Sequence, residues 1–280
     1  MTLPGRLPRL IAFAIGGLLL LVYLTYLFIP AARVNAAISD YLSVQGLALA
    51  PQVRKTVLPG LAWDNARLSS EQGDLLHIER LRVTPLLLSL LTGRAAGKGE
   101  ADLAGGRLEV TAAASGREAA SLHAKGINLA SVPFFKSVMG AKAGGNLWSE
   151  GNLTRSAQGV SGQLKLEVNQ LELSGVRLGA FPLPDVANLR AQGMVTVARN
   201  KARLESFTLQ GDGIYMRLSG ELPSGASALT APLNLTLEIM PKAEFMEKQK
   251  LVFMLLVKFM TSPGVYRIPV RGTLLKPEIL

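Results

Sequence analysis

Apolar and polar residues alternate along much of the chain beyond residue 47, a pattern typical of β-strands with one buried face. A clear example places Leu233, Leu235, Leu237 and Ile239 on one face, with polar residues between them. We expect roughly twelve strands between residues 47 and 279, separated by turns. The predicted fold class is therefore mainly β, with a long, twisted and mostly antiparallel sheet.

Some predicted strands change the face that carries their apolar residues. Leu164, Leu166 and Val168 share one parity, whereas Leu171 and Leu173 take the other. Successive side chains of a strand point to opposite faces, so such a change requires a bulge or a tight turn. The recurrent Gly-x-Leu sequence predicts strands that begin just after glycine turns, at Gly106, Gly145, Gly151, Gly162, Gly220 and Gly272.

The beginning of the chain follows a different pattern. Twenty uncharged, mostly apolar residues run from Leu10 to Ile29, and a helix of that length reaches roughly the 30 Å of a bilayer core. Arg6 and Arg9 precede this stretch, so the positive-inside rule places the N-terminus in the cytoplasm and exports the remainder. Residues 34–36 resemble a signal-peptide cleavage site, which leaves a cleaved leader as the alternative. We expect an uncleaved anchor in residues 1–30, because the apolar stretch is long for a signal peptide.

A helical period replaces the alternation in several segments. Residues 31–46 carry an apolar stripe that ends at Gly46, which predicts an amphipathic linker helix before a periplasmic β-rich domain of residues 47–280. Residues 84–93 and 131–139 are each expected to contain a short helix. The predicted organisation is therefore an anchor, a linker helix and one β-rich domain with a few short helices.

A further helical segment runs from about Lys242 to Met260. Five of its apolar residues share one face and are the candidate groove or partner contacts: Phe245, Val252, Leu255, Leu256 and Phe259. In the simpler interpretation, this helix packs across the apolar face of the sheet. Alternatively the sheet curls into an apolar groove, in which Met246, Met254 and Met260 line the groove or meet a lipid tail or a partner helix.

Composition supports a membrane environment. Apolar residues make up 49% of the chain and charged residues 18%, whereas about 25% of an ordinary soluble protein is charged. The formal net charge is +10, but the basic residues are scattered singly and are not clustered among aromatic side chains. An anionic membrane surface is therefore a more suitable partner than nucleic acid. The chain has no cysteine, which excludes disulfides and thiolate metal sites.

The sequence predicts no catalytic site. Its histidines, His77 and His123, lack neighbours at ligand spacing, and His77 is expected on the polar face of its strand. Residues 93–99 resemble a phosphate-binding loop, but they are one residue short and lack the Ser or Thr that holds magnesium. We therefore expect a protein that is not an enzyme, with no catalytic, cofactor-binding or metal site.

Five segments follow the predicted anchor in a characteristic order: PGLAWDNARL (59–68), RVTPLLLSLLTG (82–93), ADLAGGRLEV (101–110), FTLQGDGIYMRLSGEL (207–222) and YRIPVRGTLLKPEI (266–279). Together they resemble the type II secretion pathway protein N family in its shorter delta-proteobacterial form, which is similar in turn to the AsmA-like envelope proteins. The resemblance covers nearly the whole chain. Its motifs consist of small, common residues, so they specify architecture better than function.

The resemblance implies an inner-membrane accessory component of the type II secretion system, with a curled β-groove in the periplasm and other type II secretion proteins as partners. It supplies no catalytic residues. The AsmA-like relatives are linked to phospholipid movement between membranes, which implies a lipid-binding or lipid-transfer module as the alternative. The sequence alone does not decide between a protein partner and a phospholipid.

Overall fold

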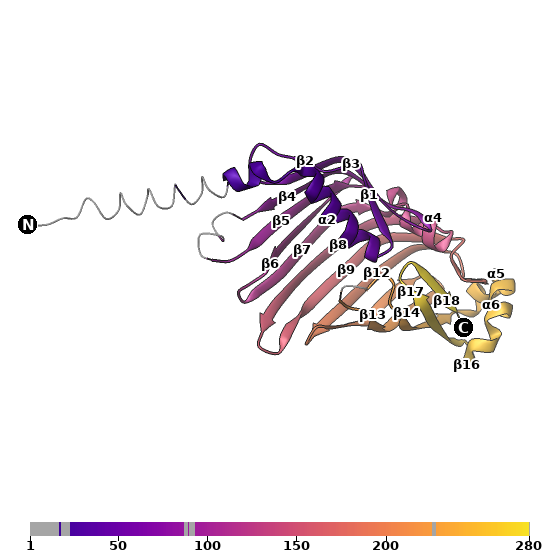
Figure 1. Cartoon of the computed structure of the whole chain (residues 1–280). Coiled ribbons are helices and arrows are strands. Elements are labelled where there is room, and N and C mark those ends of the chain that lie inside the picture. The colour runs from indigo at the N-terminus through magenta and orange to yellow at the C-terminus, as the bar shows by residue number, and fades with distance from the viewer. Residues whose placement is uncertain (1–16, 18–22, 87–88, 90–92, 226–227, 280) are drawn as a thin grey trace, which may run out of the picture.

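One antiparallel sheet runs through almost the whole chain (Figure 1). The computed structural model describes residues 17, 23–86, 89, 93–225 and 228–279. Within them the sheet has 16 strands in the order β1-β3-β4-β5-β6-β7-β8-β9-β12-β13-β14-β15-β17-β16, with β2 beside β3 and β18 beside β17. The mainly β, antiparallel prediction is confirmed. The expected number of strands was too low, because four strands of two to four residues are too short to show alternation.

The strands follow one another along the sheet, since short turns join antiparallel neighbours. The first half contains β1 (Leu47–Ala50), β2 (Arg54–Lys55), β3 (Leu61–Ser70), β4 (Gly73–Pro85), β5 (Ala96–Leu103), β6 (Gly106–Ala113), β7 (Glu118–Asn128), β8 (Lys142–Ser156) and β9 (Gly159–Ser174). The second half contains β12 (Val186–Ala198), β13 (Lys201–Gly211), β14 (Ile214–Leu222), β15 (Asn234–Pro241), β16 (Met260–Ser262), β17 (Val265–Thr273) and β18 (Lys276–Ile279). A separate hairpin pairs β10 (Arg177–Leu178) with β11 (Phe181–Pro182).

Helices precede the sheet, follow β7 and follow β15 along the chain. They are α2 (Ala31–Val44), η1 (Leu129–Ser131), α4 (Phe134–Met139), α5 (Ala243–Lys248), α6 (Lys250–Leu256) and η2 (Val257–Phe259). Figure 1 shows α2 at the N-terminal end of the sheet and α5 and α6 at the opposite end. The helices predicted in residues 31–46, 131–139 and 242–260 are therefore present. Residues 84 and 85 close strand β4, and most of the helix predicted beside them lies outside the described residues.

The register of the ladder makes one face of the sheet apolar from β3 to β17. Residues directly opposite each other in neighbouring strands share a face. One continuous row on this inner face contains only apolar residues and glycine: Leu61, Val83, Gly99, Val110, Leu122, Gly151, Leu164, Val195, Leu204, Gly220, Leu235 and Val270.

A parallel inner row contains one polar residue, Ser149, which is 3% exposed and donates its hydroxyl hydrogen to Lys165 O at 2.9 Å. The outer face is polar over the middle of the sheet. There the row of opposite residues reads Arg82, Glu100, Glu109, His123, Glu150 and Lys165. The inner face therefore needs a cover that excludes water, whereas the outer face does not.

Bulges keep the inner face apolar where the sequence parity changes. Gln170 has a φ of +53°, and the β9–β12 register shifts around it. Val168 and Leu171 are consequently both buried, at 4% and 3% exposure. The predicted bulge is confirmed, because this one extra residue returns the following side chains to the inner face.

The glycine-turn prediction was wrong for most Gly-x-Leu positions, because only Gly106 begins a strand and the others lie inside strands. Neighbouring backbones approach these glycines too closely for a side chain. A Cβ atom would lie 2.1 Å from Asn152 O at Gly162 and 2.3 Å from Asn234 O at Gly220. Glycine is required at such positions for close approach of the neighbouring strand, independently of any turn.

The C-terminal helices bury the inner face at their end of the sheet. Phe253 and Leu256 belong to the core, at 5% and 0% exposure, together with Ile239 and Ile268. The helical segment is broken at Gln249, whose φ and ψ are −124° and 36°. The side chain of Gln249 accepts a hydrogen bond from Asp185 N at 2.8 Å and donates one to Asp185 O at 2.7 Å. This pair of bonds fixes the break against the loop before β12.

The adjacent residues Leu255 and Leu256 test this packing. Leu256→Ala should lower the free energy of unfolding by about 2–5 kcal/mol, since it leaves a cavity in the core. Leu255 is 55% exposed, so Leu255→Ala should change it by no more than about 0.5 kcal/mol. Urea denaturation of the detergent-solubilised protein measures both. Equal effects of the two substitutions would contradict the described orientation of α6.

Candidate functional site

The inner face is closed at one end and open at the other. In the uniform apolar row, Leu235 and Val270 are each 5% exposed beside the C-terminal helices, whereas Val83 is 37% exposed near the N-terminal end. Val110 and Leu122, which lie between these ends, are half-buried. The candidate functional site is therefore the open part of the inner face, which spans β3 to β8.

A cavity of about 770 Å³ occupies this open part. Its lining consists mainly of small and aliphatic residues of β3 to β7, together with the chain that precedes them: Tyr26, Ile29, Val34, Lys55, Gly60, Leu61, Val83, Thr84, Pro85, Ala95, Ala96, Gly97, Ala112, Ala113, Ala114, Ala119 and Arg155. Runs of alanine and glycine leave the space that larger side chains would fill. This volume is in the range of small-molecule binding sites.

Two cationic side chains, Lys55 and Arg155, stand at this otherwise apolar cavity. Among the described residues that line it, none is acidic. The cavity thus combines an apolar wall with local positive charge, which fits a ligand that has an apolar part and an anionic group.

Helix α2 forms a second, adjoining hollow. Val34 and Ile38 of α2 pack against the N-terminal core around Trp63. A cavity of about 520 Å³ lies along the helix and shares Ile29, Val34 and Leu61 with the larger cavity. The helix, which ends at Val44 with Gly46 at a φ of +70°, is present as predicted and also forms a wall of the open groove, which was not predicted.

The chain before α2 is fastened to the sheet at the cavity. Residues 23–28 are helical. The Tyr26 hydroxyl group shares its hydrogen between Thr56 O, at 2.7 Å, and Gly60 O, at 2.9 Å. Lys55 donates to Tyr26 O and Ile29 O, and its Nζ lies 4.6 Å from the centre of the Tyr26 ring. A cation at the carbonyl end of a helix is stabilised by the helix dipole.

The predicted membrane-spanning helix, Leu10–Ile29, lies mostly outside the described residues. Among the residues that are described, no helix has both the length and the apolar character needed to cross a membrane. Its final turn, residues 23–28, lies at the cavity through the contacts of Tyr26.

The five residues predicted as groove or partner contacts lie at the closed end of the sheet. Leu256 is buried, and Phe245, Val252 and Phe259 are half-buried against the same core. Leu255 does not share their surroundings and points to solvent, because the buried face of α6 is centred on Phe253 and Leu256 and Leu255 lies outside it. None of the five lines the 770 Å³ cavity.

The sequence interpretation missed the actual lining of the cavity. Arg155 carries a readable signal, because Leu147, Ser149, Gly151 and Leu153 precede it at alternate positions of the inner face. The contact between Lys55 and Tyr26 has no such signal, since the residues are far apart in the chain and neither lies in a motif.

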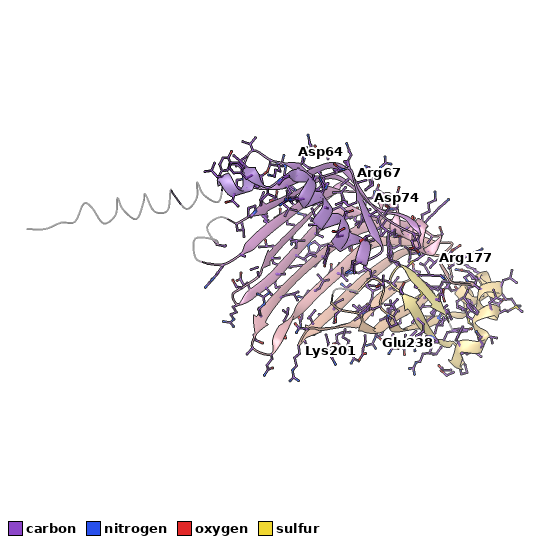
Figure 2. The ribbon with its side chains drawn as sticks, in the orientation of Figure 1. Asp64, Arg67, Asp74, Arg177, Lys201 and Glu238 are labelled. Atoms are coloured by element: carbon purple, nitrogen blue, oxygen red, sulfur yellow. The ribbon has the colours of Figure 1, made fainter. Side chains whose placement is uncertain are left out.

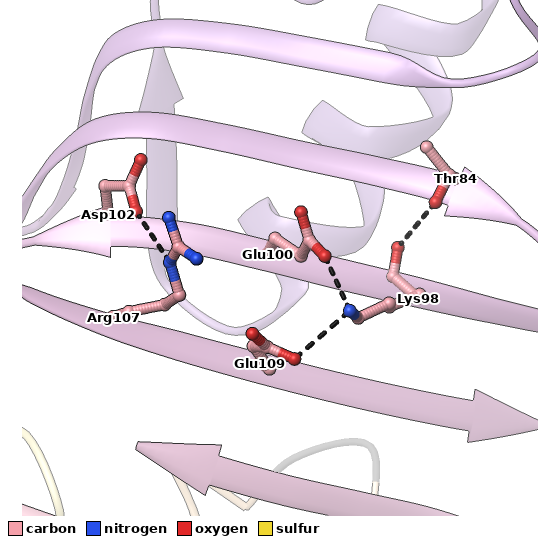
Figure 3. Close-up of polar contacts among 6 residues, drawn as sticks. All are labelled: Thr84, Lys98, Glu100, Asp102, Arg107 and Glu109. Atoms are coloured by element: carbon pink, nitrogen blue, oxygen red, sulfur yellow. Dashed lines mark hydrogen bonds and ion pairs between the residues drawn. The ribbon is translucent and has the colours of Figure 1, made fainter. Parts of the chain in front are cut away.

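The outer face carries a cluster of ion pairs on β5 and β6 (Figure 3). Lys98 Nζ lies 2.6 Å from Glu100 Oε1 and 3.1 Å from Glu109 Oε2, and Arg107 Nε lies 3.2 Å from Asp102 Oδ1. The hydrogen bond from Lys98 lowers the pKa of Glu100, and bonds to Glu100 and Glu109 raise the pKa of Lys98. Since these groups satisfy one another in solvent, we interpret the cluster as surface charge pairing.

Other charged and titratable groups are dispersed. Figure 2 shows Asp64, Arg67, Asp74, Arg177, Lys201 and Glu238 spread over the length of the sheet. His77 is exposed, as predicted, and His123 lies edge-on to Trp148. Within the described residues, no group of three or more His, Asp or Glu side chains is arranged to hold a metal ion.

Comparisons with protein-family models, curated proteins and solved structures gave no match.

The ion-pair cluster has a measurable pH signature. The pKa of Glu100 should lie below the ordinary glutamate value of about 4.3. The ion pair should therefore contribute to the free energy of unfolding above pH about 4.3, and this contribution should be lost as the pH falls through the pKa of Glu100 in the folded protein. Lys98→Met should raise the pKa of Glu100 toward the ordinary value, as followed by carboxyl-carbon NMR. Lys142→Met, at an exposed lysine outside the cluster, should leave it unchanged. No rise with Lys98→Met would refute the pairing.

Proposed function

We propose that the protein is a non-enzymatic lipid-binding module of the bacterial envelope, which holds acyl chains along the open part of its inner face. The observation that carries this proposal is the row of apolar residues and glycines that continues from the buried end of the sheet into the open cavity. An exposed apolar surface of this extent is unfavourable in water unless a ligand covers it.

The dimensions of the inner face suit an acyl chain. Neighbouring strands lie about 4.8 Å apart, so the row from β3 to β17 extends on the order of 50 Å along the sheet. One acyl layer of a bilayer core occupies roughly 15 Å, and the open part of the row exceeds that length. Covering about 200 Å² of apolar surface contributes on the order of 5 kcal/mol.

The proposed location is the inner membrane, with the N-terminus in the cytoplasm and the β-rich domain in the periplasm. The uncharged stretch Leu10–Ile29 and the preceding Arg6 and Arg9 support it. Tyr26 and Ile29, at the end of that stretch, line the cavity. The groove therefore opens beside the proposed membrane surface, where lipids are available. This arrangement agrees with what the resemblance to the AsmA-like envelope proteins implies.

A second candidate function is an accessory role in type II protein secretion, in which the protein contacts other components of the machinery. The supporting observation is a group of exposed apolar residues in α6, η2 and the start of β16: Leu251, Met254, Leu255, Val257 and Met260. These side chains are between 46% and 78% exposed. Exposed apolar side chains of this kind suit a partner surface.

Blocking the cavity tests the lipid-binding proposal. The full-length protein, extracted in mild detergent, should retain phospholipid in native mass spectrometry. Ala112→Trp places a bulky ring on an exposed position of the cavity wall and should reduce the retained lipid several-fold. Ala198→Trp, at an exposed position of β12 outside the cavity, should retain it fully. The proposal fails if the unmodified protein carries no lipid, or if both variants carry as much as the unmodified protein.

The secretion role is tested separately by photo-crosslinking in cells that assemble a type II machinery. A photoreactive residue at Leu251, which is 78% exposed, should give a specific product with a component of that machinery. The same group at Ala198 should give none. Identical products from both positions, or no product from Leu251, would exclude α6 as the contact surface.

A further inference from the structure

Arg155 is a charged residue on the apolar face of the sheet. It occupies the next inward position of β8 after Leu147, Ser149, Gly151 and Leu153. Its register partner on β9 is Val160, so the guanidinium group stands among apolar neighbours. An arginine in such a place is costly unless its charge and its donors find partners.

The guanidinium group is only partly satisfied. Nη2 of Arg155 donates to Ala113 O at 3.1 Å. Nη1 is buried and, within the described part of the chain, has no hydrogen-bond partner. No carboxylate of the described residues lies within ion-pair distance of Arg155 either. A buried donor without a partner marks a position where an external acceptor is missing.

The surroundings of Arg155 indicate what that acceptor belongs to. The residue lines the 770 Å³ cavity, whose wall beside it consists of alanines, including Ala112, Ala113 and Ala119. A small anion alone would satisfy the guanidinium group but would leave this apolar wall uncovered. A molecule with an acyl chain and an attached phosphate satisfies both, because guanidinium binds phosphate oxygens through strong, charge-assisted hydrogen bonds.

We propose that Arg155 binds the phosphate group of a phospholipid whose acyl chain lies on the open inner face, and that it thereby selects phosphate-bearing lipids over neutral ones. This inference rests on the proposed lipid-binding function and adds its specificity-determining residue. Lys55 also lines the cavity, but its three ammonium donors already have acceptors in Tyr26 O, Leu27 O and Ile29 O, so Arg155 is the cation of the cavity lining with an unused donor.

The test compares two lipids with identical acyl chains. The full-length protein in detergent is titrated with dioleoyl phosphatidylglycerol or with dioleoylglycerol, which lacks the phosphate, and bound lipid is counted by native mass spectrometry. The unmodified protein should prefer the phospholipid. Arg155→Gln should weaken phospholipid binding by at least roughly tenfold and leave dioleoylglycerol binding unchanged. Arg190→Gln, at an exposed arginine of β12 outside the cavity, should change neither.

Two further measurements keep the outcome interpretable. Arg155→Lys retains the positive charge but lacks the planar guanidinium group, so its affinity for the phospholipid should lie between those of the unmodified protein and Arg155→Gln. If circular dichroism shows that Arg155→Gln is unfolded, Arg155→Lys replaces it in the comparison. Glycerol 3-phosphate, added alone, should not compete with the phospholipid at similar concentration, and effective competition would indicate a site for a soluble phosphate compound, contrary to the proposal.

The failures of the two proposals are distinguishable. If phosphatidylglycerol binds Arg155→Gln as tightly as the unmodified protein, the role of Arg155 is wrong while lipid binding stands. If neither lipid binds the unmodified protein, the lipid-binding function itself is wrong, and the inference about Arg155 falls with it.

Discussion

The register of the antiparallel ladder is the constraint on which the rest of the structure depends. Every strand from β3 to β17 contributes an apolar residue or a glycine to the same inner row. A slip of one residue in any strand would turn its apolar residues to the solvent and its charged residues inward. The bulge at Gln170 prevents such a slip in β9 by letting Val168 and Leu171 both face the core. The bulge therefore keeps the inner face apolar along the whole strand.

An apolar face of this length must be covered, and the two ends of the sheet solve this problem differently. At the C-terminal end, Phe253 and Leu256 of α6 complete the core, held by the bonds between Gln249 and Asp185. Toward the N-terminal end α2 covers only part of the face, and the row continues into an open cavity beside Val83 and Ala112. The same row thus serves as a protein core in one half and, in the proposed function, as a binding surface in the other. This difference in covering, rather than a difference in the strands, supports the proposed function.

The alternation of apolar and polar residues was sufficient to predict the sheet and individual strands such as β15. It was not sufficient for strands of two to four residues, nor for the glycines at which neighbouring backbones approach closely, because both depend on the partner strand. The helical segment 242–260 was located correctly, but residues 251–257 are all apolar, so the periodicity does not determine which side of the helix is buried. Phe253 therefore lies in the core, whereas Leu255 lies outside the face that it was predicted to share. The cavity was missed because the small residues that line it, such as Ala112 and Ala113, stand out only when the strands are assembled.

The position of Arg155 follows from the same assembly and connects the groove to its proposed surroundings. Tyr26 and Lys55 fasten the end of the N-terminal segment to the loop between β2 and β3, so the cavity keeps a fixed position relative to that segment. In the proposed membrane arrangement, the positive charge of Arg155 then stands in the same cavity as Tyr26 and Ile29, which end the proposed anchor. A phospholipid that entered with its acyl chain along the row would leave its phosphate beside Arg155. The Nη1 atom of Arg155 lacks a hydrogen-bond acceptor within the described part of the chain, and the open apolar row lacks a cover that excludes water. In the proposed function one phospholipid supplies both, through its phosphate and its acyl chain.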